Sequence, residues 1–237
     1  MTRLSTSRLL ALTFLFLCLV LLWDASGLDL PVARLAGTPH GFPWRDRELF
    51  VLLMHEGPRF LSWIVLAGLF AAIRWPAGVL RRLDMAERAQ LAVTVLASVI
   101  AVSLLKSVST TSCPWDLVEF GGVARHVSHW AWGVADGGPG RCFPAGHASA
   151  AFAYLGGWFV LRRHVPGAAR AWLAIAIVVG LVLGLGQQWR GAHYMSHTLW
   201  TAWICWSVGL GVDLACQALR RMHSRRTAAP AGASFGR

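Results

Sequence analysis

The chain alternates between long apolar runs and short polar connections. The apolar runs extend from about Leu9 to Trp23, Phe60 to Ile73, Ala89 to Leu105, Ala148 to Leu161, Ala171 to Leu185 and Leu199 to Ala218. A helix needs about 20 mostly apolar residues to cross a bilayer, so flanking residues must extend several of these runs. The pattern predicts an all-α, polytopic membrane bundle with about six transmembrane helices.

Two features near the N-terminus leave alternatives open. The first run follows Arg3 and Arg8, and its length also suits the h-region of a signal peptide. We favour an uncleaved helix, because six alternating spans then give a consistent topology. Residues Arg45 to Met54 are expected to form a short interfacial helix ahead of the second span.

Composition supports the membrane interpretation. Hydrophobic residues make up 56% of the chain and charged residues 14%, whereas a soluble domain carries about 25% charged residues. The formal net charge is +11, but the basic residues lie in short clusters between apolar runs rather than on one polar face. This arrangement excludes nucleic acid as the partner and indicates the bilayer instead.

The positive clusters predict the orientation of the spans. They fall on one side of the membrane if the spans alternate, and comprise Arg3, Arg8, Arg74, Arg81, Arg82, Arg88, Arg162, Arg163, Arg170, Arg220, Arg221, Arg225 and Arg226. That side is expected to be the cytoplasm, with both termini on it, in a bacterial-type inner (cell) membrane. We expect a single transmembrane domain over residues 1–221 and a disordered basic tail over 222–237.

Chemically capable side chains gather in the connections on the opposite side, at 106–147 and 186–197. Lys106 is unusual because every other basic residue, apart from the histidines, is Arg. The histidines and arginines in these connections are Arg125, His126, His129, Arg141, His147, Arg190, His193 and His197. A purely structural role does not require His and Arg to collect where helices emerge on one side.

Three local patterns carry this chemistry. The first is Lys106 followed, after seven residues, by Pro114; the second is Pro144-Ala145-Gly146-His147 at the start of an apolar helix. In the third, His193 and His197 are spaced i, i+4 and share a helical face. Two histidines on one face suggest a zinc site, but no third ligand can be named. Taken singly, each is more often an interfacial histidine with satisfied hydrogen bonds.

Together the three patterns resemble the signature of the type-2 phosphatidic acid phosphatase superfamily, which also contains vanadium haloperoxidases. That signature is Lys, six residues, Arg-Pro; then Pro-Ser-Gly-His; then Ser-Arg, five residues, His, three residues, Asp. Lys106 and Pro114 keep the first spacing. Ala145 replaces the Ser of the second motif, and His197 takes the Asp position of the third. The resemblance covers about residues 60–215.

Two departures remove phosphate-binding guanidinium groups. Cys113 stands at the first motif's Arg and Gln187 at that of the third. Arg190 and Arg141 are nearby and could supply the missing charge. In an alternative register His197 is the anchor and Thr201 its partner, but this register requires an insertion.

The resemblance implies an acid phosphatase-type hydrolase that cleaves a phosphoric ester or diphosphate through a phosphohistidine, without metal or cofactor. His193 would attack phosphorus, His197 would orient His193, and His147 would protonate the leaving oxygen. The phosphoryl oxygens would be held by Lys106, Arg190, Arg141 and the backbone at Gly146.

The expected substrate is a lipid phosphate at the outer headgroup level, such as phosphatidate, phosphatidylglycerophosphate, an isoprenyl diphosphate or lipid A. The same intermediate would also serve a lipid phosphotransferase. A degenerate member that binds phospholipid without turnover is a further alternative. A small transporter fits less well, because the clear acid within a span, Asp213, lies near a helix end.

The resemblance also bears on the cysteines. If the motifs converge on one phosphate, Cys113 and Cys142 must come close, and an oxidising compartment would favour a disulfide between them. Two free buried thiols are the alternative. Cys18, Cys205 and Cys216 lie inside predicted spans, where a small apolar thiol is ordinary.

Overall fold

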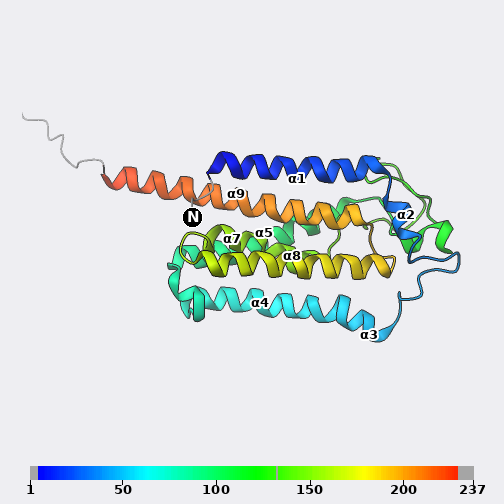
Figure 1. Ribbon diagram of the computed structural model, residues 1–237, viewed down its shortest axis with the longest axis horizontal. Coiled ribbons are helices and arrows are strands. Elements are labelled where there is room, and N and C mark those ends of the chain that lie inside the picture. The colour runs from blue at the N-terminus through cyan, green and yellow to red at the C-terminus, as the bar shows by residue number, and fades with distance from the viewer. Residues whose placement is uncertain (1–4, 132, 229–237) are drawn as a thin grey trace, which may run out of the picture.

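The computed structural model describes residues 5–131 and 133–228, which form a bundle of long helices (Figure 1). No β-strand is found within these residues. The elements are α1 Thr6–Ser26, α2 Asp29–Ala33, α3 Glu48–Val51, η1 Leu52–Glu56, α4 Gly57–Arg74, η2 Gly78–Arg82, α5 Met85–Val108, η3 Pro114–Asp116, η4 Val118–Phe120, α6 Ser149–Phe152, η5 Ala153–Gly156, α7 Gly157–Leu161, α8 Pro166–Trp189 and α9 Met195–Ala228.

Five helical stretches are long and apolar enough to cross a membrane, which confirms the all-α, multi-pass architecture. They are Thr6–Ser26, Glu48–Arg82, Met85–Val108, Pro166–Trp189 and Met195–Arg225. The fourth of the six predicted spans is a shorter apolar helix, Ser149–Leu161. At about 1.5 Å per residue it does not match its neighbours in length, because the chain before Ser149 continues into the bundle as an irregular segment.

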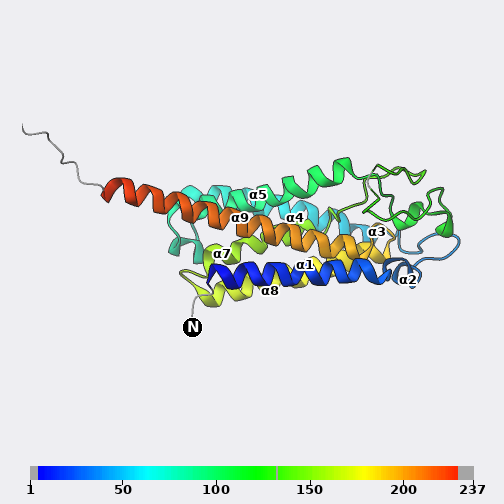
Figure 2. The same ribbon diagram turned by 90° about the horizontal axis from the view of Figure 1, so that it is seen from above.

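The bundle has two distinct ends. We call the end that carries the start of α1 and the end of α9 the tail end, and the opposite one the loop end. Residues 109–148 and the turn between α8 and α9 lie at the loop end (Figures 1 and 2). The prediction of disorder from residue 222 is wrong for its first part, since α9 continues to Ala228; residues 229–237 lie outside the described range.

Local sequence explains where the main helices begin. Asp84 and Glu87 form a reciprocal capping box at the start of α5, with the Glu87 amide donating to the Asp84 carboxylate at 2.7 Å. Pro166 occupies the first turn of α8, where its missing N–H costs nothing. The expected interfacial helix at Arg45 to Met54 is not separate, because α3 continues through the π-helical turn η1 directly into α4.

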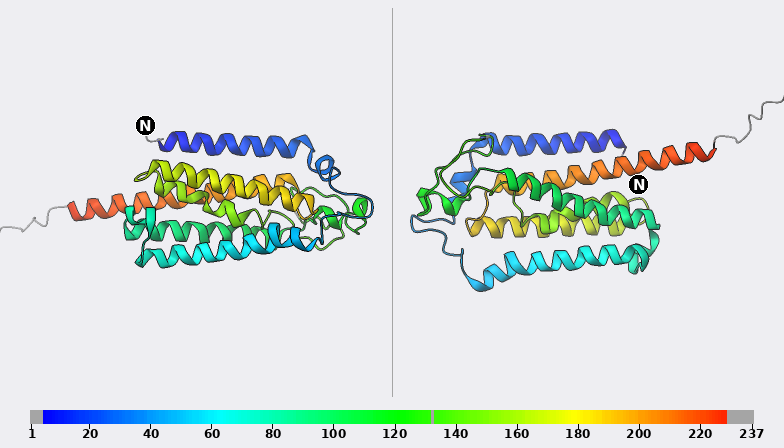
Figure 3. Two further views of the ribbon diagram at one scale, coloured as in Figure 1. Left: turned by 60° about the horizontal axis from the view of Figure 1, so that its bottom comes forward. Right: turned by 180° about the vertical axis from the view of Figure 1, so that it is seen from behind.

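Small residues allow the helices to approach closely at the core. A Cβ on Gly209 of α9 would lie 2.8 Å from the Cα of Gly156, so these two backbones touch. Helix α1 runs along α9 (Figure 3), where the indoles of Trp203 and Trp206 donate to the carbonyl and hydroxyl of Thr13.

Polar contacts stabilise the tail end of the bundle, and apolar contacts stabilise the loop end. At the tail end, Asp213 is fully buried, accepts from Gln90 at 2.9 Å and pairs with Arg163. At the loop end a small separate core joins the 24–47 segment to the 109–148 segment, and includes Phe42, Phe120 and Tyr194. This cap fixes the segments that carry the sequence motifs.

Candidate active site

The three sequence motifs meet at the loop end. Lys106 lies in the last turn of α5, His147 just before α6, and His193 in the turn between α8 and α9. Nδ1 of His147 is 3.4 Å from Nε2 of His193. The Lys106 side chain passes Gly146, where an added Cβ would be 3.5 Å from Cδ of Lys106. Three motifs that are far apart in the sequence therefore place their side chains in one cluster.

The backbone around His193 is tightly held. Gly191 has φ of +75°, and a Cβ there would lie 2.3 Å from the ring of Phe42, so glycine is required for both conformation and space. The Gly191 carbonyl accepts from the Trp115 amide at 2.9 Å. The Thr201 hydroxyl of α9 donates to the Ala145 carbonyl at 3.1 Å, which ties the second motif to the third.

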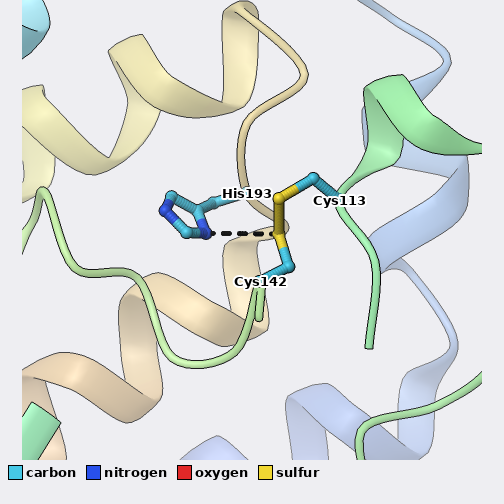
Figure 4. Close-up of side chains that lie close together, drawn as sticks. All are labelled: Cys113, Cys142 and His193. Atoms are coloured by element: carbon cyan, nitrogen blue, oxygen red, sulfur yellow. Dashed lines mark hydrogen bonds between the residues drawn. A yellow bond between two sulfur atoms is a disulfide. The ribbon is translucent and has the colours of Figure 1, made fainter. Parts of the chain in front are cut away.

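A disulfide joins Cys113 to Cys142, with a Cα–Cα distance of 5.1 Å (Figure 4). It is the pair considered from sequence. Nδ1 of His193 lies 3.6 Å from Sγ of Cys142. Cys113, Cys142 and His193 also form a group whose potential metal-ligand atoms lie within 4.8 Å of one another. Both sulfurs are in the disulfide, so neither is the thiolate that a metal requires.

His197 does not hold His193 as the resemblance implied. The two rings meet edge to face with centroids 5.8 Å apart, and no hydrogen bond joins them in the described structure. Helical i, i+4 spacing places two side chains on one face, but their ring nitrogens need not point at each other. Nδ1 of His193 faces Cys142 instead, and Nδ1 of His197 is buried without a partner.

Gln187, which stands at the Arg position of the third motif, has a clear structural role. Its amide donates to the Met54 carbonyl, and its side-chain oxygen accepts from Arg190 at 3.2 Å. Arg190 also donates through Nε to the Arg45 carbonyl at 3.0 Å and is 7% exposed. Gln187 thus fixes the shifted guanidinium of Arg190 instead of supplying one itself.

Two residues of this site were missed by sequence reasoning. The His55 ring, in the π-helical turn η1, lies 4.3 Å from the His147 ring between centroids. The positive charge of Arg59, like those of Lys106 and Arg190, lowers the pKa of His147. No motif marks His55 or Arg59, which lie just ahead of the second predicted span.

One predicted phosphate-binding residue is not brought to the cluster. Arg141 is exposed and has a left-handed backbone, with φ of +58°. Its amide donates to the Ser109 carbonyl, and its charge is not among those that act on His147 or His193. Arg141 therefore bonds to the connection through its backbone amide, and the residue is exposed.

Burial and positive charge keep both site histidines neutral. Burial, followed by the charges on His55 and Lys106, lowers the pKa of His147 to about 3. Burial, followed by the Lys106 charge, holds the pKa of His193 well below its usual value. Two neutral imidazoles among cationic side chains form a site with unbalanced positive charge, which favours an anion.

The comparison with known families agrees with this geometry. A model described as the PAP2 superfamily matches residues 88–221, more than half of the chain. The chain belongs to this superfamily. Neither the curated proteins nor the solved structures contain a match. Membership confirms the resemblance found in the motifs and supports a phosphatase-type, hydrolytic function at a membrane.

The family match also covers both departures from the signature. Within residues 88–221, Cys113 forms the disulfide beside His193, and Gln187 fixes Arg190. Neither departure leaves a void or an unpaired charge. The substituted positions have acquired structural functions, and the positive charge around His147 comes from other residues.

Replacing both disulfide cysteines by Ser should lower the free energy of unfolding by about 3 kcal/mol, because the closed loop no longer restricts the unfolded chain. Turnover should fall as well, since Cys142 faces His193. Thermal denaturation and phosphatase assays of the purified protein in detergent would measure both effects. Cys18→Ser, at an exposed free cysteine, is the control. A double variant as stable and active as the parent would contradict this prediction.

Proposed function

We propose that the chain hydrolyses a lipid phosphate monoester or diphosphate through a phosphohistidine at His193. The supporting observation is the 3.4 Å approach of His147 Nδ1 to His193 Nε2 beside Lys106. A phosphoryl group placed there would meet a nucleophile, a proton donor and a cation. In-line displacement places the nucleophile and the leaving oxygen on opposite sides of phosphorus, so the two rings must separate to admit the phosphoryl group.

In the first step, Nε2 of His193 attacks phosphorus while the bond to the leaving oxygen breaks. His147 gives its proton to that oxygen, so the lipid leaves as an alcohol or as a lipid phosphate. In the second step, a water molecule attacks the phosphorus of the N–P intermediate. His147 takes the proton of this water, the N–P bond breaks, and inorganic phosphate leaves.

Cationic side chains around His147 would stabilise the charge on the phosphoryl oxygens in both steps. Lys106 and Arg190 were expected in this role, and Arg59 joins them. Their number argues against a degenerate member that has lost its phosphate site. His197 is not assigned a catalytic step, because its ring does not bond to His193.

A lipid substrate is supported by the position of the site. The motifs lie at the ends of apolar helices, where a phosphate headgroup can reach them while its chains stay among the helices. We further propose that the loop end faces the periplasm or exterior and the tail end the cytoplasm. The Arg clusters lie in tail-end connections, as the positive-inside tendency requires.

Reporter fusions test this orientation. Alkaline phosphatase fused after His129, in the loop-end connection, should be active, because that position is exported. The same reporter fused after Arg163, in the tail-end connection, should be inactive. The reverse pattern would refute the proposed orientation but would leave the proposed reaction mechanism unaffected.

Substitution of the two histidines tests the mechanism. His193→Ala should abolish turnover of lipid phosphates, and His147→Ala should reduce kcat by about 10²- to 10⁴-fold, as expected for loss of a general acid. His40→Ala, at an exposed histidine, is the matched control. If His193→Ala kept the parental rate while His197→Ala was inactive, the register of the third motif would be wrong.

The pH profile should reflect the low pKa of His147. With a pKa of about 3 its ring is neutral in the empty site, so kcat/KM, corrected for ionisation of the substrate, should show no His147 inflection between about pH 5 and 8. Bound phosphate charge stabilises the protonated ring and raises its pKa. Therefore kcat should fall as pH rises through that raised value, and the fall should vanish in His147→Ala. An inflection of kcat/KM near pH 6.5 that His147→Ala removes would contradict this.

A further inference from the structure

A second polar cavity lies at the loop end, separated from the phosphate-binding cluster by His197. Its volume is about 220 Å³, and it is lined by the end of α1, residues 126–129 and the start of α9. Four side-chain atoms on it are buried without a hydrogen-bond partner: Oδ1 of Asp24, Nε2 of His129, the hydroxyl of Tyr194 and Nδ1 of His197. Tyr194 is 3% exposed, His197 1%, and the Asp24 side chain 7%. Unsatisfied buried groups are costly, so the cavity is built for a polar occupant.

The charge of this cavity is opposite to that of the phosphate site. Asp24 and Asp29 line it, and neither Lys nor Arg is among the lining residues. Asp29 is satisfied, since Trp23 and the Ser196 amide donate to it at 2.8 and 3.0 Å. Asp24 accepts two indole N–H bonds on Oδ2, which also lies 3.4 Å from Nε2 of His129, and Oδ1 has no partner. A phosphate would be repelled by two carboxylates, whereas a cation would be attracted.

An apolar cavity of about 490 Å³ adjoins the polar one. Thr111 and His129 line both. Apart from these, the larger cavity is lined mainly by aliphatic and aromatic side chains of α5, α9 and the connection, among them Leu105, Val108, Phe143, Trp203 and Ile204. Trp130 and Trp200 belong to it too, and their indole N–H groups are those bound to Asp24. Polar and apolar cavities joined in this way match an amphiphile.

We propose that this pair of cavities binds an amphiphile that carries a primary ammonium group, with the ammonium beside Asp24 and the chain in the apolar cavity. All four unpartnered atoms can accept a hydrogen bond when the two imidazoles present an unprotonated nitrogen, and an ammonium brings three N–H donors and no acceptor. A hydroxyl would supply one donor and no positive charge. A chelated metal ion fits less well, because Asp24, His129 and His197 are not among the described groups whose ligand atoms lie within 4.8 Å of one another.

The proposal is independent of the phosphatase mechanism, since it concerns a different cavity and is tested by binding rather than turnover. The probes are n-octylamine, which is protonated at pH 7, and n-octanol. Each is titrated calorimetrically into the full-length protein in micelles of an uncharged detergent. The amine should bind at least about tenfold more tightly than the alcohol. The net charge of +11 disfavours non-specific binding of an amine.

Asp24→Asn keeps the shape of the side chain and one oxygen for the indoles but removes the charge. It should reduce the preference for the amine by about tenfold. Glu119→Gln, which removes an exposed carboxylate paired with Arg34, should leave it unchanged. Tyr194→Phe removes a single acceptor and should weaken octylamine binding about threefold, and it serves in place of Asp24→Asn if that variant does not fold.

Three results would overturn the proposal. Equal binding of octanol and octylamine would show a site for a neutral hydroxyl. Binding of neither probe would show a cavity that holds water alone. An amine preference that survives in Asp24→Asn, or octylamine binding that is unchanged in Tyr194→Phe where that variant takes its place, would show that the ammonium group lies elsewhere.

Discussion

The structure of the site depends on one covalent constraint, the bond between Cys113 and Cys142. The 109–148 connection is long, and its described residues contain only two short helical turns, η3 and η4. Without a fixed point, such a segment would lose much conformational entropy on placing His147. The disulfide holds Cys142, and the Thr201 bond to Ala145 holds the residues that follow. His147 is therefore positioned by its own segment rather than by the helix it precedes.

A second consequence concerns how positive charge reaches the phosphate site. The family signature supplies it from arginines within the motifs, whereas here Cys113 and Gln187 stand at those positions. Charge comes instead from Arg190, fixed by Gln187, and from Arg59 on the neighbouring α4. Long side chains allow such replacement, because a guanidinium carries its charge far from its own backbone. The site therefore has positive charge for a phosphate although both arginines of the signature are replaced.

The sequence predicted the features that depend on local patterns. It did not predict those that depend on contacts between segments far apart in the chain. Apolar runs report burial directly, so the helices and their number were recoverable, apart from the shortened Ser149–Leu161 helix. Motif spacing reported that Lys106, His147 and His193 converge. The orientation of the His197 ring and the contribution of His55 were not recoverable. They depend on packing between segments far apart in the chain, on which a local pattern carries no information.

The i, i+4 pair at the start of α9 shows what local spacing can and cannot specify. His193 and His197 stand one turn apart, which suggested a single joint function. Their ring nitrogens instead point to different surroundings: His193 contacts His147 in a cluster rich in positive charge, and His197 lines a cavity with two carboxylates. The short stretch from His193 to the first turn of α9 thus has a different cavity or cluster on each side. Both rings are fully buried, and an imidazole can donate or accept a hydrogen bond, so the same residue type can occupy both environments.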